Sequence, residues 1–181
     1  RPGAVAPESI ASIFGAELAS FVSIASSQPL PFVLGNTGVS FHASNGVDYR
    51  AQLFFASPGQ VNLLVPANLP SGNATITVGG FADVPYSLGN IEIENVVPGL
   101  FSADSTGQGY ASAVVLRLLR DGTQAYEPVT RFDQMQNRVV AVPIDLSSAE
   151  DQVFLLLFGT GVRRHAVTIP PIVKIGGVDS E

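Results

Sequence analysis

The chain has 181 residues, of which 46% are hydrophobic and 13% charged, and its formal net charge is −6. Nucleic acid and anionic membranes are bound through clustered basic side chains, and Arg163-Arg164 is the only adjacent basic pair, so both are excluded as partners. The absence of cysteine excludes disulfides and Cys-ligated zinc, and no apolar run approaches the roughly 20 residues of a membrane helix.

The low charge also describes the surface that we expect. Lysine occurs once, at Lys174, so the surface must consist mainly of Ser, Thr, Asn, Gln and Gly. Such a surface is less protected against association than a charged one. The sequence begins at Arg1 without a visible signal peptide, and we expect it to be a mature or excised segment of a longer protein.

Residues 1–97 predict one unit built of short strands. Apolar, β-branched and aromatic segments alternate with Pro, Gly and Asn, a pattern typical of an immunoglobulin-like antiparallel β-sandwich. Asn45-Gly46 predicts a hairpin turn because both residue types accept positive φ. The predicted strands are Ile10–Phe14, Val39–Ala43, Tyr49–Ala56, Val61–Val65, Asn73–Val78 and a last one within residues 84–97.

Residues 98–181 predict a second sandwich that begins at Pro98-Gly99. The predicted strands are Tyr110–Leu119, Tyr126–Val129, Val139–Ile144 and Gln152–Phe158. The last of these is apolar on both faces, which predicts a central strand. The predicted fold class is therefore all-β, with tandem immunoglobulin-like antiparallel β-sandwiches of which the second is incomplete in this chain.

The second unit is expected to be incomplete because two of its segments resemble segments of the first unit. Ile13-Phe14-Gly15 resembles Leu157-Phe158-Gly159, and Val39-Ser40-Phe41 resembles Val173-Lys174-Ile175. Strands follow the second segment in unit one, whereas the chain ends at Glu181 in unit two. The missing strands lie outside this segment, or the second half packs onto the first as one domain, or a neighbouring chain supplies them by donor-strand assembly.

Several blocks occur in a combination that is typical of one family. In the first half the blocks are Ala6-Pro7-x-Ser9-Ile10-x-Ser12-Ile13-Phe14-Gly15, Pro29-Leu30-Pro31, Gly38-Val39-Ser40 and Ser57-Pro58-Gly59-Gln60-Val61-Asn62. In the second half they are Pro98-Gly99-Leu100-Phe101, Asp121-Gly122-Thr123-Gln124, Tyr126-Glu127-Pro128-Val129 and Leu157-Phe158-Gly159-Thr160-Gly161. Together these blocks resemble the "Solibacter uncharacterized C-terminal domain" family of long secreted bacterial proteins, whose units are similar to IPT/TIG immunoglobulin-like modules. The resemblance implies an extracellular or cell-surface location and no catalytic residues.

The candidates for chemistry are few. His42 and His165 are the only histidines, and a metal site or a catalytic triad needs further partners close to one of them. Glu92 and Glu94 are two residues apart on one strand face, a spacing that a glycosidase pair could use, but a solvated strand face opposite Ile91 and Ile93 is expected. Surface residues are the expected role of all four.

Three further motifs each allow a functional and a purely structural interpretation. Asp104-Ser105-Thr106-Gly107-Gln108-Gly109 offers oxygen ligands for calcium but holds one carboxylate, so a connecting loop is expected. Gly107-x-Gly109 precedes a predicted strand and lacks the helix that a phosphate loop needs. Asn73-Ala74-Thr75 matches the glycosylation pattern, but the entry of a strand is the expected role.

We therefore assign no catalytic, cofactor-binding or metal-binding residues and expect no enzyme. The sequence predicts a structural or adhesive module of a secreted or surface bacterial protein that self-assembles through open strand edges. Its expected partners are copies of itself, neighbouring modules of the parent protein and surface polysaccharide. The alternative is a carbohydrate-binding module, for which Tyr49, Tyr86, Tyr110 and Tyr126 would form an exposed platform.

Overall fold

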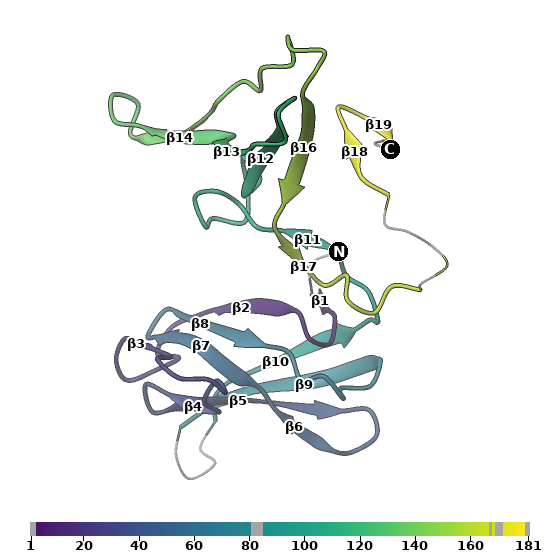
Figure 1. The fold of residues 1–181 in the computed structure, drawn as a ribbon. Helices are drawn as coiled ribbons and strands as arrows, with labels where there is room; N and C mark the ends of the chain where they lie inside the picture. Colours follow the sequence, from purple (N-terminus) through teal and green to yellow (C-terminus); the bar gives the residue numbers. More distant parts are fainter. Residues whose placement is uncertain (1–2, 81–84, 167, 169–171, 180–181) are drawn as a thin grey trace. The chain divides into compact units, whose positions relative to one another are not determined.

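The structure is a computed structural model that describes residues 3–80, 85–166, 168 and 172–179. Throughout this part of the chain the regular structure is strand, without any helix, as Figure 1 shows. Nearly all strand pairs are antiparallel; β1 (Ala4–Val5) and β10 (Pro85–Ile93) pair in parallel. The predicted all-β antiparallel class is confirmed.

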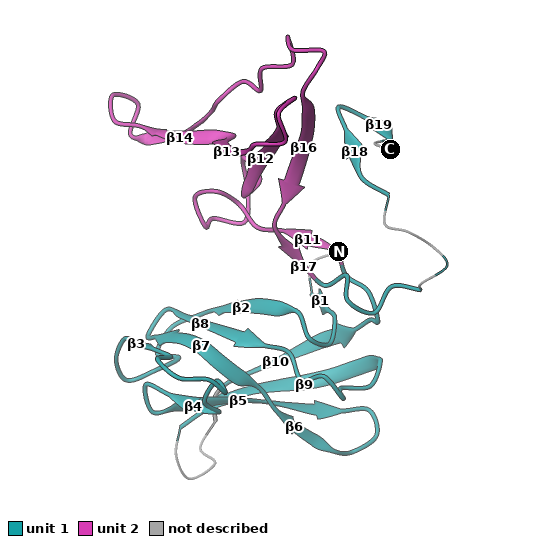
Figure 2. Ribbon diagram, in the orientation of Figure 1, with its two compact units in different colours: residues 1–97, 161–181 teal, residues 98–160 magenta. Residues whose placement is uncertain are grey.

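The contacts within the chain divide it into two compact units (Figure 2). Unit 1 comprises residues 1–97 and 161–181, and unit 2 comprises residues 98–160. The division falls directly before Pro98, whereas residues 161–181 group with unit 1 and not with the second sandwich to which the sequence assigned them. An ion pair of 2.9 Å between Arg163 Nη1 and Glu8 Oε1 accompanies this grouping.

Unit 1 is a β-sandwich of two sheets, drawn in the lower half of Figure 1. One sheet has the order β1-β10-β9-β5-β4, with β6 also paired to β5, and the other has the order β2-β8-β7-β3. The remaining strands are β2 (Ile10–Phe14), β3 (Ser23–Ile24), β4 (Val33–Leu34), β5 (Thr37–Ala43), β6 (Asp48–Arg50), β7 (Gln52–Ser57), β8 (Gln60–Leu64) and β9 (Gly72–Gly79). A short hairpin of β18 (Lys174–Ile175) and β19 (Val178–Asp179) also belongs to this unit.

The core of unit 1 follows from the alternation of side chains along its strands. Val39, Phe41 and Ala43 of β5 are buried, and so are Val61 and Leu63 of β8 in the facing sheet. Successive side chains of a strand point to opposite faces, so each sheet contributes one apolar face to a shared core. This pairing of faces gives the sandwich its stability.

Turn chemistry fixes the register of the hairpins in unit 1. Gly46 has φ of 77°, and Asn45 Oδ1 accepts a hydrogen bond of 3.1 Å from the Val47 amide between β5 and β6. Between β7 and β8, the Ser57 hydroxyl oxygen accepts a 3.0 Å hydrogen bond from the Gln60 amide. The predicted hairpin at Asn45-Gly46 is confirmed.

Unit 2 contains a three-stranded sheet with the order β13-β12-β16 and two separate strand pairs. Its strands are β11 (Gly99–Leu100), β12 (Ala113–Leu118), β13 (Gln124–Pro128), β14 (Thr130–Asp133), β15 (Arg138–Ala141), β16 (Gln152–Leu157) and β17 (Gly159–Thr160). β14 pairs with β15, and β11 pairs with β17. All four strands that the sequence predicts here are present, although β12 and β15 are shorter than expected.

The order of the three-stranded sheet corrects one prediction. The apolar strand Gln152–Phe158 was expected at the centre of a sheet, but β12 occupies the centre and β16 lies at the edge. The side chains of β16 alternate between exposed and half-buried, so the strand is not enclosed. The side chains of β16 are apolar on both faces, but this pattern does not require burial of both faces, and β16 has one exposed face.

Candidate functional site

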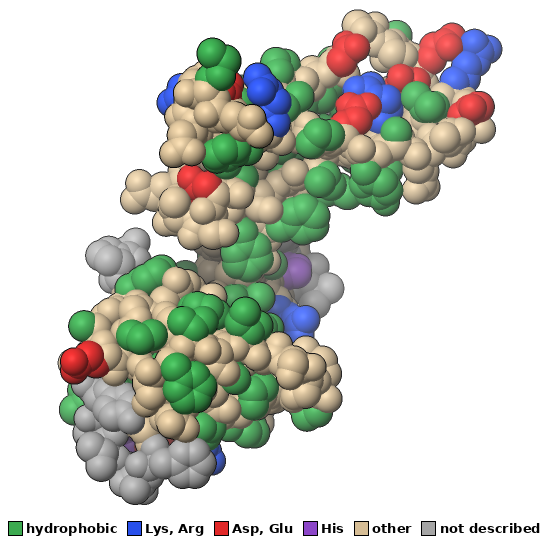
Figure 3. Space-filling model, turned by 90° about the vertical axis from the view of Figure 1, so that its left-hand side faces the viewer, with side chains coloured by type: hydrophobic (Ala, Val, Ile, Leu, Met, Phe, Trp, Pro, Cys, Tyr) green, Lys and Arg blue, Asp and Glu red, His purple; other side chains and the backbone are tan. Residues whose placement is uncertain are grey.

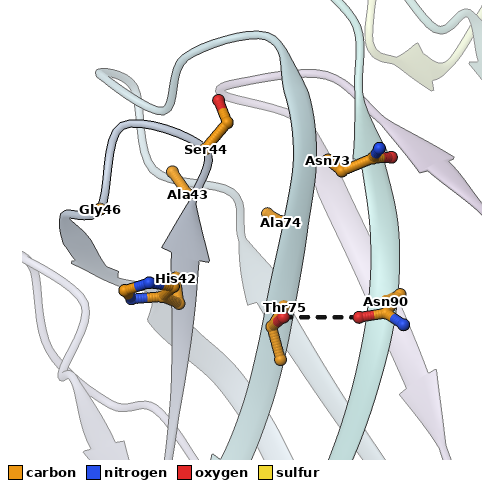
Figure 4. A pocket seen from close by; sticks show the side chains of 8 residues that line it. All are labelled: His42, Ala43, Ser44, Gly46, Asn73, Ala74, Thr75 and Asn90. Carbon is orange, nitrogen blue, oxygen red and sulfur yellow. Dashed lines mark hydrogen bonds between the residues drawn. The ribbon is translucent and has the colours of Figure 1, made fainter.

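A shallow pocket of about 330 Å³ lies beside β5, β9 and β10 of unit 1 (Figure 4). Its lining is polar and small, and comprises His42, Ala43, Ser44, Gly46, Asn73, Ala74, Thr75 and Asn90. His42 is paired with Thr75 across β5 and β9, and Thr75 is paired with Asn90 across β9 and β10. The three side chains therefore form a short polar row across neighbouring strands.

His42 and Thr75 of this pocket each have a polar side-chain partner. His42 Nδ1 lies 2.7 Å from Asp48 Oδ1, and Thr75 Oγ1 donates a 3.4 Å hydrogen bond to Asn90 Oδ1. His42 and Asp48 are both exposed, which leaves their pairing accessible to water. Asn73 belongs to β9, as the strand-entry interpretation of Asn73-Ala74-Thr75 predicts.

The other predicted candidates differ in exposure and in their partners. His165 is exposed and its Nδ1 lies 2.8 Å from the carbonyl oxygen of Val162. Glu92 is exposed on β10, whereas Glu94 is half-buried just beyond the end of that strand. Within residues 3–80, 85–166, 168 and 172–179, no three His, Asp or Glu side chains are grouped so that they could hold a metal ion.

The loop at residues 104–109 is ordered by its own hydrogen bonds. Asp104 Oδ1 accepts hydrogen bonds from the Thr106 hydroxyl at 2.7 Å and from the Thr106 amide at 3.1 Å. These bonds lower the pKa of Asp104 below its ordinary value, with the hydroxyl making the larger contribution. Asp104 Oδ1 is therefore engaged within the loop. The residues that follow form a β-bridge at Ala111 and the strand β12.

The described tyrosines differ in exposure and in the unit to which they belong. Tyr49 is half-buried against the core of unit 1, and its hydroxyl accepts a 2.9 Å hydrogen bond from Asn45 Nδ2. Tyr110 and Tyr126 are exposed in unit 2. The side chain of Tyr86 lies outside the described part of the structure.

Arg117 forms a buried ion cluster in unit 2 that the sequence analysis missed. Its Nε donates to Glu127 Oε1 at 2.6 Å and its Nη2 donates to Glu127 Oε2 at 3.0 Å, a bidentate pair. Nη2 also donates to the carbonyl oxygen of Asp145 at 2.8 Å, and Nη1 lies 3.7 Å from Asp151 Oδ2. The cluster fastens the segment between β15 and β16 to one face of the sheet.

The stability of unit 2 is expected to fall in acid because of this cluster. The hydrogen bond from Arg117 lowers the pKa of Glu127 below its ordinary value of 4.5. A carboxylate whose pKa is lower in the folded than in the unfolded protein stabilises the fold above pH 4.5, and this contribution is lost as the pH falls through the lowered value. Thermal unfolding followed by circular dichroism between neutral and acidic pH should show a steeper loss of melting temperature in the native chain than in Glu127→Gln. Equal slopes would show that the ion pair does not contribute.

The other face of the same sheet is apolar and exposed to solvent. Cross-strand pairing places Tyr126, Leu116 and Phe154 in one row and Pro128, Val114 and Leu156 in the next. Tyr126 is 65% exposed and Phe154 is 45% exposed. We call these six residues, with Leu118, the β16 face. Figure 3 shows hydrophobic side chains open to solvent on the face of the molecule that it presents. An exposed apolar face is a candidate interaction surface.

The edge of the sheet beside this face is also open. β16 pairs with β12 on one side, and no strand in the described part of the chain pairs with its other side. Charged residues and proline usually protect an edge strand from further pairing. Residues 152–158 contain neither. Face and edge together form the strongest candidate functional site of the molecule.

Comparison with known proteins adds no relative. No family model matches the chain, and no curated protein does. The described residues contain no helix that could cross a membrane. Function must therefore be inferred from the side chains and the open edge themselves.

Proposed function

We propose that this protein is a non-catalytic structural or adhesive module that assembles through the open edge of β16 and the β16 face. The observation that carries this proposal is an uncharged, apolar edge strand without a pairing partner in the described structure. Unpaired backbone N–H and C=O groups on such an edge are a template for a further strand.

The exposed side chains supply the second part of the driving force. Phe154 and Leu156 lie on the β16 face at the open edge, and Tyr126 extends the same face across the sheet. Covering these side chains removes apolar surface from water, which favours association in proportion to the area buried. Ladder hydrogen bonds and apolar burial would thus act at one surface.

The resemblance to the secreted bacterial family supports the setting of this function. The proposal includes membership in that family, immunoglobulin-like modules in tandem and an extracellular or cell-surface location. The low proportion of charged residues, 13%, agrees with a surface suited to association. The polysaccharide alternative would use the same β16 face, where two exposed rings, Tyr126 and Phe154, lie in one cross-strand row.

Sedimentation velocity over a wide range of protein concentration tests the proposed function. The sedimentation coefficient should rise with concentration as free edges become occupied. A folded monomer at every concentration would contradict assembly. Adding soluble neutral polysaccharide to that monomer would then show whether the β16 face binds sugar instead.

A further inference from the structure

The hydrogen bonds of β16 determine which of its backbone groups face the open edge. The Phe158 amide donates a 3.0 Å hydrogen bond to the Ser112 carbonyl oxygen, directly before β12. In an antiparallel pair, alternate residues exchange both hydrogen bonds with the partner strand. Phe154 and Leu156 therefore bond to β12, whereas Val153, Leu155 and Leu157 direct their N–H and C=O groups to the open edge.

This alternation restricts how a second copy of β16 can pair antiparallel with the first. A two-fold axis perpendicular to the sheet keeps the same face of both copies on the same side, so opposed residues must differ by an even number in sequence. When the axis passes through Leu155, the backbone groups of Val153, Leu155 and Leu157 all form hydrogen bonds between the two copies. Leu155 then lies opposite Leu155 of the second copy, and Val153 lies opposite Leu157.

The same axis matches the exposed side chains of the two copies. Phe154 lies opposite Leu156 of the second copy on the β16 face, in a non-hydrogen-bonded pair where side chains approach most closely. Each opposed pair within Val153–Leu157 is apolar, and no like charges meet. A charge at position 155 would lie opposite its own copy on the two-fold axis, and β16 has leucine there.

The geometry points to a two-fold dimer in which β16 pairs antiparallel with β16 of a second copy about Leu155. The three-stranded sheets of the two copies then join into one continuous six-stranded sheet. The two β16 faces become a single apolar surface on one side of it. This inference rests on the proposed assembly function and specifies its partner and its register.

Cysteine cross-linking tests the register because the native chain has no cysteine. Opposed residues in a hydrogen-bonded antiparallel pair have Cα atoms about 5.5 Å apart, within the range that a disulfide spans. Leu155→Cys should therefore form a disulfide-linked dimer under mild oxidation. Leu88→Cys, at an exposed leucine of unit 1, is the matched control and should cross-link at least about tenfold more slowly.

A second pair of variants covers the case in which Leu155→Cys folds poorly. Phe154→Cys and Leu156→Cys change exposed side chains, and a mixture of the two proteins should form the mixed disulfide faster than either protein alone forms its own. Cross-linking no faster than in Leu88→Cys for both designs would overturn the inference. If concentration-dependent association persists in that case, the proposed assembly function stands and only this partner and register fail.

Discussion

Replacing Phe41 with alanine is expected to lower the free energy of unfolding of unit 1 by about 3–5 kcal/mol. Phe41 is 1% exposed and lies in the core between the two sheets of the sandwich. Truncation removes buried apolar area and leaves a cavity that the rigid strands of β5 and its neighbours can only partly fill. Urea denaturation followed by circular dichroism measures the loss.

The matched control for this change is Phe14→Ala. Phe14 belongs to β2 of the same unit but is 69% exposed, so its removal is expected to change the free energy of unfolding by only about 0.5 kcal/mol. Similar effects of the two substitutions would show that the inner and outer faces of unit 1 are assigned wrongly. The comparison therefore tests the sandwich itself and not merely the presence of strands.

Replacing both Phe154 and Leu156 with lysine is expected to abolish association. In the proposed dimer each new lysine lies opposite a lysine of the second copy, and like charges directly opposite one another destabilise a strand pair. The apolar contact between Phe154 and Leu156 is also lost. We expect the dissociation constant to rise at least about a hundredfold, measured by sedimentation velocity.

Leu88→Lys supplies the control for this double variant. Leu88 is 65% exposed on β10 of unit 1, so the substitution adds one of the two lysine charges of the double variant and leaves the sequence of unit 2 unchanged. The control protein should associate as the native chain does. If Leu88→Lys dissociates the protein as strongly as the double variant, net charge and not the β16 edge governs association.

Much of unit 1 was predictable because its sequence patterns are local. Alternation of apolar and polar residues predicts β5 and β8, and Asn45-Gly46 predicts the hairpin after β5, since each depends only on neighbouring residues. The ends of the strands were less predictable because tertiary pairing decides them. Tyr110–Leu119, for example, was expected to be one strand, but regular pairing begins only at Ala113.

The features of unit 2 that matter most depend on contacts between distant residues. Arg117 gives no local sign of burial, because its partner Glu127 is brought to it only by the pairing of β12 with β13. The apolar character of β16 was visible, but sequence alone does not show whether another strand covers it. Opposite charges on two adjacent predicted strands were the one available signal for the ion cluster.

Residue-resolved amide hydrogen exchange tests the use of the β16 edge most directly. The Phe154 and Leu156 amides bond to β12 in every state and should be protected at all protein concentrations. The Val153, Leu155 and Leu157 amides face the open edge, and their exchange should slow as the concentration rises and edges pair. Fast exchange of these three amides at all concentrations, while their neighbours stay protected, would contradict assembly through β16.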